Sequence, residues 1–224
     1  YADFRSEMNA RTARQIDRAQ PDLTPGEKYL RTLEHLGSGS LISDVSQYTL
    51  NNLQKSYAQL DQGTVEQIVD ILLRSDRKYI AGFRGTACCA QYMASKLLFL
   101  TPHVVPILHA DATAVENLLD ITERDCLFLY SFPRYSEIAR PLMEIARESG
   151  AKVILMTDRR TSPLANKADV VVTAQVDGLG FTNSYVAPLS LSEVILLSVS
   201  GRKDVKDSKR FNRIDSVMER EKLY

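Results

Sequence analysis

Residues 78–174 contain five short apolar runs: KYIAG (78–82), VVPIL (104–108), CLFLYS (126–131), KVILMT (152–157) and DVVVTA (169–174). Helical patterns lie between these runs and after the last one. A strand that is apolar throughout, without alternation, is typical of a parallel sheet covered on both faces by crossover helices. The sequence therefore predicts an α/β fold, a three-layer αβα sandwich with a five-stranded parallel sheet.

Further helices are predicted on both sides of this region. Residues 50–60 and 65–73 carry apolar side chains at three- and four-residue spacing, so each segment is expected to lay one face on a core. Residues 205–223 are expected to form one amphipathic C-terminal helix. The Gly-Ser-Gly-Ser stretch at 37–40 is the expected flexible joint between an N-terminal arm and the domain.

Charge and cysteine content indicate which partners and which cellular compartment to expect. The chain has 28 basic and 28 acidic residues, so no global field attracts nucleic acid or an anionic membrane. Three sparse cysteines, with Cys88 beside Cys89, do not form a metal-binding pattern and suit a reducing compartment, so a cytoplasmic location is expected. No apolar run reaches the roughly 20 residues that a transmembrane helix needs, and no membrane partner is expected.

The turn after the first strand is a candidate binding element. Ligands of open parallel sheets bind at the carboxyl ends of the strands, near the point where the strand order reverses. Here the sequence reads Gly82-Phe83-Arg84-Gly85-Thr86-Ala87 and opens a helix whose free amides can hold an anion. It is neither a Walker A loop nor the full dinucleotide fingerprint. In the alternative interpretation it is a tight turn in which Thr86 caps the helix.

The turn after the third strand carries the richest polar cluster. Ser131, Arg134, Tyr135 and Ser136 together offer hydroxyl groups, a guanidinium and backbone amides to one small polar ligand. Alternatively, Ser136 caps the next helix while Arg134 points to solvent. Pro141 predicts that this helix begins irregularly, because proline lacks an amide hydrogen.

The remaining polar positions favour structural roles. Ser162 followed by Pro163 is typical of a helix start, and Asn183 or Ser184 is expected to cap the last helix of the sandwich, the alternative being contact with the ligand. None of the three histidines lies at metal-ligand spacing, so neither a metal nor a cofactor is expected. His109 and Glu193 are the candidates for an acid–base catalyst, but neither lies in a catalytic motif.

The strand order and turns from Lys78 to Ala174 resemble the SIS (sugar isomerase) fold. The turn at 82–86 lies where that family usually has Gly-x-Gly-x-Ser, and the turn at 131–136 lies where it has Ser-x-Ser-Gly-x-Thr, which binds the phosphate of a phosphosugar. Four stretches look specifically like RpiR-type bacterial transcription regulators: SFPRYSE (131–137), GAKVILMTD (150–158), SPLANKADVVV (162–172) and LGFTNSYVAPL (179–189).

This resemblance implies a domain organisation and a function. Residues 1–40 are expected to be a helical arm left from a helix-turn-helix domain and its linker, and residues 41–224 the SIS ligand-binding domain. The helix-turn-helix domain is missing from this chain, and DNA would be bound only through it. The domain is expected to sense a sugar phosphate or other sugar derivative for a regulator of carbohydrate metabolism, as a homodimer or tetramer and not as an enzyme.

Two departures from the family pattern bear on the ligand. Arg84 replaces a glycine, and Pro133-Arg134 replaces Ser-Gly in the phosphate-binding turn. Proline offers neither a hydroxyl nor an amide hydrogen, whereas either arginine can bind phosphate or carboxylate through two hydrogen bonds. A phosphorylated or acidic ligand is favoured, and a neutral polyol is the alternative. The expected ligand-binding residues are Arg84, Gly85, Thr86, Ser131, Arg134, Tyr135 and Ser136.

Two other functions remain open at this point. An aldose–ketose isomerase on the same fold would need an acid–base catalyst within reach of the sugar carbons. A ligand-free assembly module would be consistent with the altered phosphate-binding turn.

Overall fold

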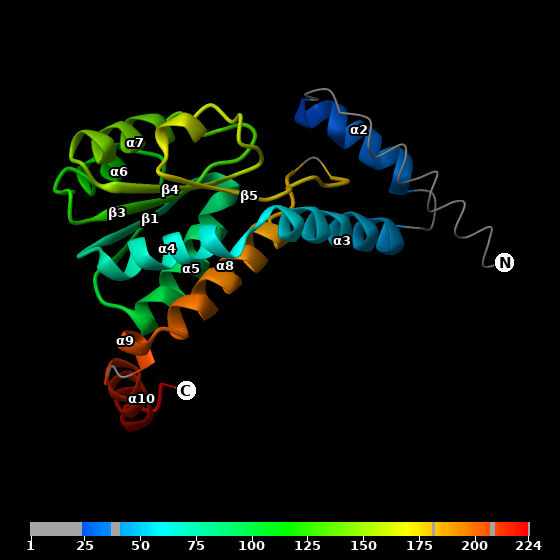
Figure 1. The fold of residues 1–224 in the computed structure, drawn as a ribbon. Coiled ribbons are helices and arrows are strands. Elements are labelled where there is room, and N and C mark those ends of the chain that lie inside the picture. The colour runs from blue at the N-terminus through cyan, green and yellow to red at the C-terminus, as the bar shows by residue number, and fades with distance from the viewer. Residues whose placement is uncertain (1–23, 37–40, 181, 207–208, 224) are drawn as a thin grey trace.

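The computed structural model describes residues 24–36, 41–180, 182–206 and 209–223. Its centre is a five-stranded, wholly parallel sheet with the order β2-β1-β3-β4-β5 (Figure 1). The strands are β1 (Lys78–Gly82), β2 (Val104–Ile107), β3 (Cys126–Tyr130), β4 (Lys152–Thr157) and β5 (Val170–Thr173). These bounds lie within one residue of the five apolar runs, and the predicted sheet is confirmed.

Helices cover both faces of the sheet. One face packs on α4 (Gln62–Arg74), α5 (Ala87–Leu100) and α8 (Val186–Ser200), and the other on α6 (Ala112–Glu116) and α7 (Ala139–Glu148) (Figure 1). Successive strand residues alternate between the two cores: Ile80 and Phe128 belong to the first, Tyr79 and Leu127 to the second. Because both cores are apolar, the strands read as continuous apolar runs. The three-layer sandwich is confirmed.

Two predicted helix caps are wrong. After β4 the chain forms only a short 3₁₀ turn, η2 (Ala165–Lys167), and the Ser162 hydroxyl caps nothing. Helix α8 begins after Tyr185 without a side-chain cap, because Asn183 donates to the Pro133 carbonyl instead and the Ser184 amide donates to the Val176 carbonyl. The irregular start predicted for α7 is found, since this helix begins only at Ala139.

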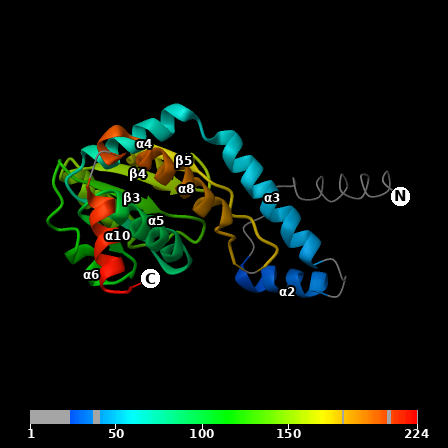
Figure 2. The ribbon, with the colours of Figure 1, turned by 90° about the horizontal axis from the view of Figure 1, so that it is seen from below.

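Helices α2 (Pro25–Leu36) and α3 (Leu41–Gln59) form an arm that extends away from the sandwich (Figure 2). The expectation that residues 50–60 lay an apolar face on the core is met only at Leu60, which packs against the core just after α3. Leu50 and Tyr57 are exposed, and the buried residues of α3 are Asn52 and Ser56. The reason is that α3 packs its polar side chains on the main chain after β5. The expected joint at 37–40 lies outside the described residues, as do residues 1–23.

The C-terminal segment is divided into α9 (Lys203–Lys206) and α10 (Arg210–Arg220), so the prediction of one helix over 205–223 is wrong. Helix α10 packs on the end of α5: the Arg210 guanidinium donates to the Leu98 carbonyl at 2.8 and 3.0 Å, and the Phe211 ring centroid lies 6.2 Å from that of Phe99. The side chain of Phe211 is still half-exposed. Within the described ranges, no helix combines the length and apolar character needed to cross a bilayer.

Candidate ligand-binding site at the carboxyl ends of the strands

The strand order places the candidate site between β1 and β3. From β1 the chain passes to β2 on one side and then crosses to β3 on the other, so the strand order reverses at β1. The helix that follows β1, α5, covers one face of the sheet, and the helix that follows β3, α7, covers the opposite face. Ligands of open parallel α/β sheets bind outside the strand ends at such a point of divergence.

The turn after β1 is held tightly by its own residues. A Cβ atom on Gly82 would lie 2.6 Å from the Thr86 carbonyl oxygen and 2.9 Å from the Ala90 Cβ, so only glycine lets α5 begin this close to the strand. The Thr86 hydroxyl accepts a hydrogen bond from the Phe83 amide at 2.7 Å and donates to the Phe83 carbonyl at 2.8 Å. This geometry favours the structural interpretation of Thr86.

Arg84 and Arg134 adopt left-handed backbone conformations, with φ angles of 56° and 68°. These are the two positions where the SIS pattern has glycine, and the left-handed region costs a residue with a side chain roughly 1–2 kcal/mol. Both side chains are exposed, and no carboxylate of the described residues pairs with either guanidinium. The turns therefore keep the glycine-like backbone and add two positive charges without an ionic partner in the described protein.

The turn after β3 contains a buried hydroxyl group with an unused hydrogen-bonding capacity. Ser131 is 4% exposed, and its Oγ has no hydrogen-bond partner in the described part of the chain. Its main chain is held in place, because its amide donates to the Met156 carbonyl on β4 at 3.0 Å. A buried hydroxyl without a partner costs about 1–3 kcal/mol relative to a bonded one, so this position favours an incoming polar group.

Tyr135 and Ser136 have structural partners. The Tyr135 hydroxyl donates to Asp158 Oδ1 at 2.7 Å, and the same oxygen accepts from Thr157 at 3.2 Å. Arg159 pairs with the other oxygen of Asp158 at 3.7 Å. The Ser136 carbonyl accepts the Ala139 amide at the start of α7. The Ser136 hydroxyl makes no hydrogen bond within the described residues, so Ser131, Ser136 and the two arginines keep the most bonding capacity among the expected ligand-binding residues.

Tyr185 joins the two turns, which sequence reasoning missed. A Cβ on Gly85 would lie 2.8 Å from the Tyr185 ring, and the ring also packs edge-on against Phe132, with centroids 6.0 Å apart. Burial raises the pKa of Tyr185, while Asn183 and the nearby Arg134 act in the opposite direction. Nothing in the sequence around Tyr185 indicates that its ring contacts residues 50 to 100 positions earlier in the chain.

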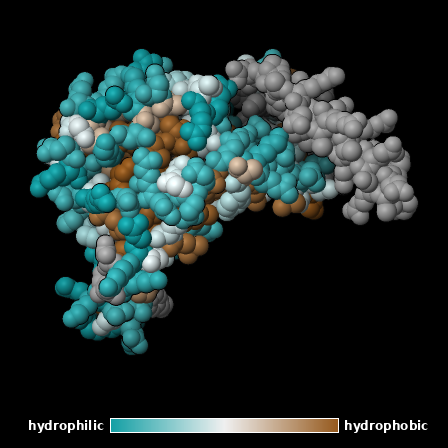
Figure 3. Space-filling view, in the orientation of Figure 1, coloured by the Kyte–Doolittle hydropathy of each residue, from teal (hydrophilic) through white to brown (hydrophobic). Residues whose placement is uncertain are grey.

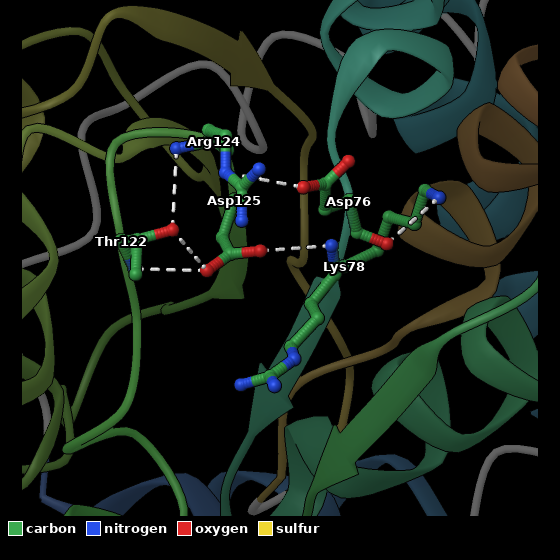
Figure 4. A network of polar contacts seen from close by, with 6 residues as sticks. Asp76, Lys78, Thr122, Arg124 and Asp125 are labelled. Carbon is green, nitrogen blue, oxygen red and sulfur yellow. Dashed lines mark hydrogen bonds and ion pairs between the residues drawn. The ribbon is translucent and has the colours of Figure 1, made fainter.

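A depression lies at the opposite, amino-terminal edge of the sheet, where Asp125 and Arg124 are held by hydrogen bonds and an ion pair (Figure 4). The Asp125 carboxylate accepts from the Arg77 amide at 2.9 Å and from the amide and hydroxyl of Thr122 at 2.8 and 2.9 Å. Arg124 pairs with Asp76 at 3.3 Å. This network ties β1 to the turn before β3, which is a structural role, and none of the expected ligand-binding residues lines the depression.

The two acid–base candidates lie elsewhere. Glu193 is exposed on α8 and accepts a hydrogen bond from the Tyr92 hydroxyl of α5 at 2.9 Å. His109 is exposed in the loop after β2. No hydrogen bond or ion pair of the described residues links either side chain to Ser131 or Arg134. The described residues also contain no group of three histidine, cysteine or acidic side chains placed to bind a metal ion.

A doubly covered parallel sheet, with polar turns on both sides of its order reversal, defines an α/β domain of the type that binds small molecules at its strand ends. Residues 71–198, more than half of the chain, match the family model of the SIS domain, and the chain belongs to the SIS domain family. No curated protein matches its sequence.

Solved structures share the fold. The sugar isomerase domain of an RpiR transcription factor from Sphaerobacter thermophilus has a TM-score of 0.74 and 22% identity, over 81% of this chain and 99% of that one. The Vibrio vulnificus NanR protein complexed with ManNAc-6P has a TM-score of 0.68 and 17% identity, over 83% and 71%. Protein c3406 of E. coli CFT073 has a TM-score of 0.65 and 16% identity, over 78% and 95%.

Proposed function

We propose that this chain is the effector-binding domain of a cytoplasmic, DNA-binding transcription regulator of carbohydrate metabolism, and that it is not an enzyme. Residues 41–224 form the ligand-binding domain, and residues 1–40 form an arm that leads to a helix-turn-helix domain. The ligand is a small sugar derivative with a phosphate or carboxylate group. The observation that carries this proposal is the buried, unpartnered Ser131 hydroxyl at the end of β3, on the same turn as the unpaired Arg134.

The chemistry of the turns supports an anionic sugar derivative. A sugar hydroxyl or a phosphate oxygen would satisfy Ser131, and a guanidinium binds phosphate or carboxylate through paired, charge-assisted hydrogen bonds. Arg84 and Arg134 keep a backbone conformation that glycine would adopt at lower cost. The cost of this backbone conformation is explained if the two side chains bind a ligand. The ManNAc-6P bound by the similar NanR protein supports the same class of ligand.

A sensing role is favoured over isomerisation because neither acid–base candidate, Glu193 or His109, is linked to Ser131 or Arg134 within the described residues. Proton transfer requires the catalytic group within about 3 Å of the proton that it moves. Glu193 is engaged by Tyr92 on the outer surface of α5 and α8, and His109 is in a loop beside the edge strand. The similarity to an RpiR transcription factor domain supports the same choice.

We also propose that the domain acts as a homodimer or tetramer. Apolar side chains lie at the surface over α8 and the outer part of α3 (Figure 3), where Ile42 is 88% and Leu197 is 72% exposed. Phe211 on α10 adds a third exposed apolar group. Apolar patches of this kind are typical of surfaces that bind another protein. The N-terminal helices and α10 are therefore the proposed interface elements.

A thermal-shift screen tests the ligand. An external dye is needed because the protein has no tryptophan. A ligand at 100 times its dissociation constant is expected to add about 2.7 kcal/mol to the free energy of unfolding. We expect this stabilisation from a sugar phosphate, amino-sugar phosphate or sugar acid, with neutral polyols as the matched controls. Stabilisation by polyols alone would contradict the role of the arginines, and no stabilisation by any compound would favour the ligand-free assembly module.

A further inference from the structure

The segment that follows β5 contacts the ligand-binding turns at one end and the helical arm at the other. Its distal end carries Asn183, which donates to the Pro133 carbonyl at 3.3 Å, and Tyr185, which packs on Gly85 and Phe132. Any ligand that enters between the two turns must therefore lie beside this segment.

The near end of the same segment is hydrogen-bonded along the arm. The Gln175 amide donates to Ser56 Oγ at 2.8 Å, and the side-chain amide of Asn52 donates to the Asp177 carbonyl at 2.6 Å. From α2, the Thr32 hydroxyl donates to the Leu179 carbonyl at 2.7 Å. Ser56 and Asn52 are buried, which explains why α3 covers this segment with polar and not with apolar side chains.

The two ends are also joined within the segment. The Ser184 amide donates to the Val176 carbonyl at 3.0 Å. This bond holds the start of the segment, next to Gln175, against its end, next to Tyr185. A Cβ on Gly178 would lie 2.9 Å from the Thr182 carbonyl oxygen, so the two halves of the loop pack tightly. These contacts join the end of the segment at Tyr185 to its main chain near Asp177.

We infer that the described parts of the segment after β5, residues 176–180 and 182–185, couple the ligand site to the arm: occupation of the turns moves this segment and, through Asn52 and Thr32, shifts α3 and α2. This inference rests on the proposed function, because it supplies the physical route by which a ligand would reposition a DNA-binding domain attached to the arm. Coupling of this kind is reciprocal, so a change at the arm end must alter the turns even when no ligand is present.

Hydrogen exchange of the ligand-free protein tests this coupling. In Asn52→Ala and, as a milder change, Thr32→Val, we expect the amides of 176–185 and those of 83–88 to exchange about two- to tenfold faster, the effect of one lost hydrogen bond on a local opening. Gln54→Ala, an exposed change on the same helix, is the matched control and should leave both segments unchanged. Strand β3 exchanges by global unfolding, so its rates measure the loss of overall stability, and the turn at 83–88, which opens locally, is the readout of the coupling.

The outcomes separate the coupling from the ligand proposal. Faster exchange confined to 176–179, with the turn at 83–88 unchanged in both variants, would overturn the inference. Because the experiment uses no ligand, that result would leave the proposed function to the thermal-shift screen. Conversely, faster exchange at 83–88 in a protein that binds no sugar derivative would support the coupling and contradict the proposed ligand.

Discussion

Replacing Arg134 by glycine is expected to stabilise the folded domain and weaken ligand binding at the same time. Glycine adopts the left-handed conformation at φ 68° without the steric cost that a side chain has there, so the free energy of unfolding should rise by about 1 kcal/mol. Loss of the guanidinium should cost about 1.5–3 kcal/mol of binding, or roughly ten- to 150-fold in affinity. Denaturant unfolding and titration with the sugar derivative found by screening measure the two effects.

Two matched variants distinguish the effect of the left-handed backbone from the effect of the guanidinium. Arg134→Ala keeps the left-handed strain, so it should lose affinity to the same degree while the free energy of unfolding stays unchanged. Arg140→Ala, an exposed arginine on α7, should alter neither quantity. If Arg134→Gly binds the ligand as tightly as the wild-type protein, Arg134 does not belong to the site.

The substitution Gly82→Ala is expected to destabilise the fold strongly. The new methyl group would lie 2.6 Å from the Thr86 carbonyl oxygen and 2.9 Å from the Ala90 Cβ, so either α5 or β1 must shift. Overpacking of this kind costs about 1–3 kcal/mol. The upper end of this range is expected because the nearest atom belongs to the backbone and cannot rotate away. A fall of about 3 kcal/mol in the free energy of unfolding follows from the same principle.

Gly26→Ala provides the control for this substitution. No atom lies within 4 Å of a Cβ built at Gly26 in helix α2, so alanine should be neutral or should stabilise that helix by up to about 1 kcal/mol. Equal denaturation midpoints for Gly82→Ala and the wild-type protein would contradict the close approach of α5 to β1.

The sheet was predictable because each strand is a continuous apolar run, and such runs arise only where both faces of a strand are covered. The covering helix α4 was predictable from its three- and four-residue spacing, since Val65, Ile68 and Leu72 fall on one buried face. Helix α3 was predictable only in part, because its buried Asn52 and Ser56 bond to the polar main chain after β5. Helical periodicity reports which residues share a face but does not identify the neighbouring surface.

The site was predictable only in part. The position of the turns follows from topology, which places the ends of β1 and β3 together. The hydroxyl groups of Thr86 and Tyr135 are bonded to Phe83 and Asp158, which local sequence does not reveal. The unpartnered state of Ser131 likewise depends on packing around the strand end.

Hydrogen exchange with and without a sugar phosphate or sugar acid that stabilises the protein locates the bound ligand. We expect slower exchange at 83–88 and 131–138, the turns after β1 and β3, with no change at 119–125 on the opposite edge of the sheet. Slower exchange at 119–125, with the two turns unaffected, would place the ligand in the depression beside Asp125 and contradict the proposed site.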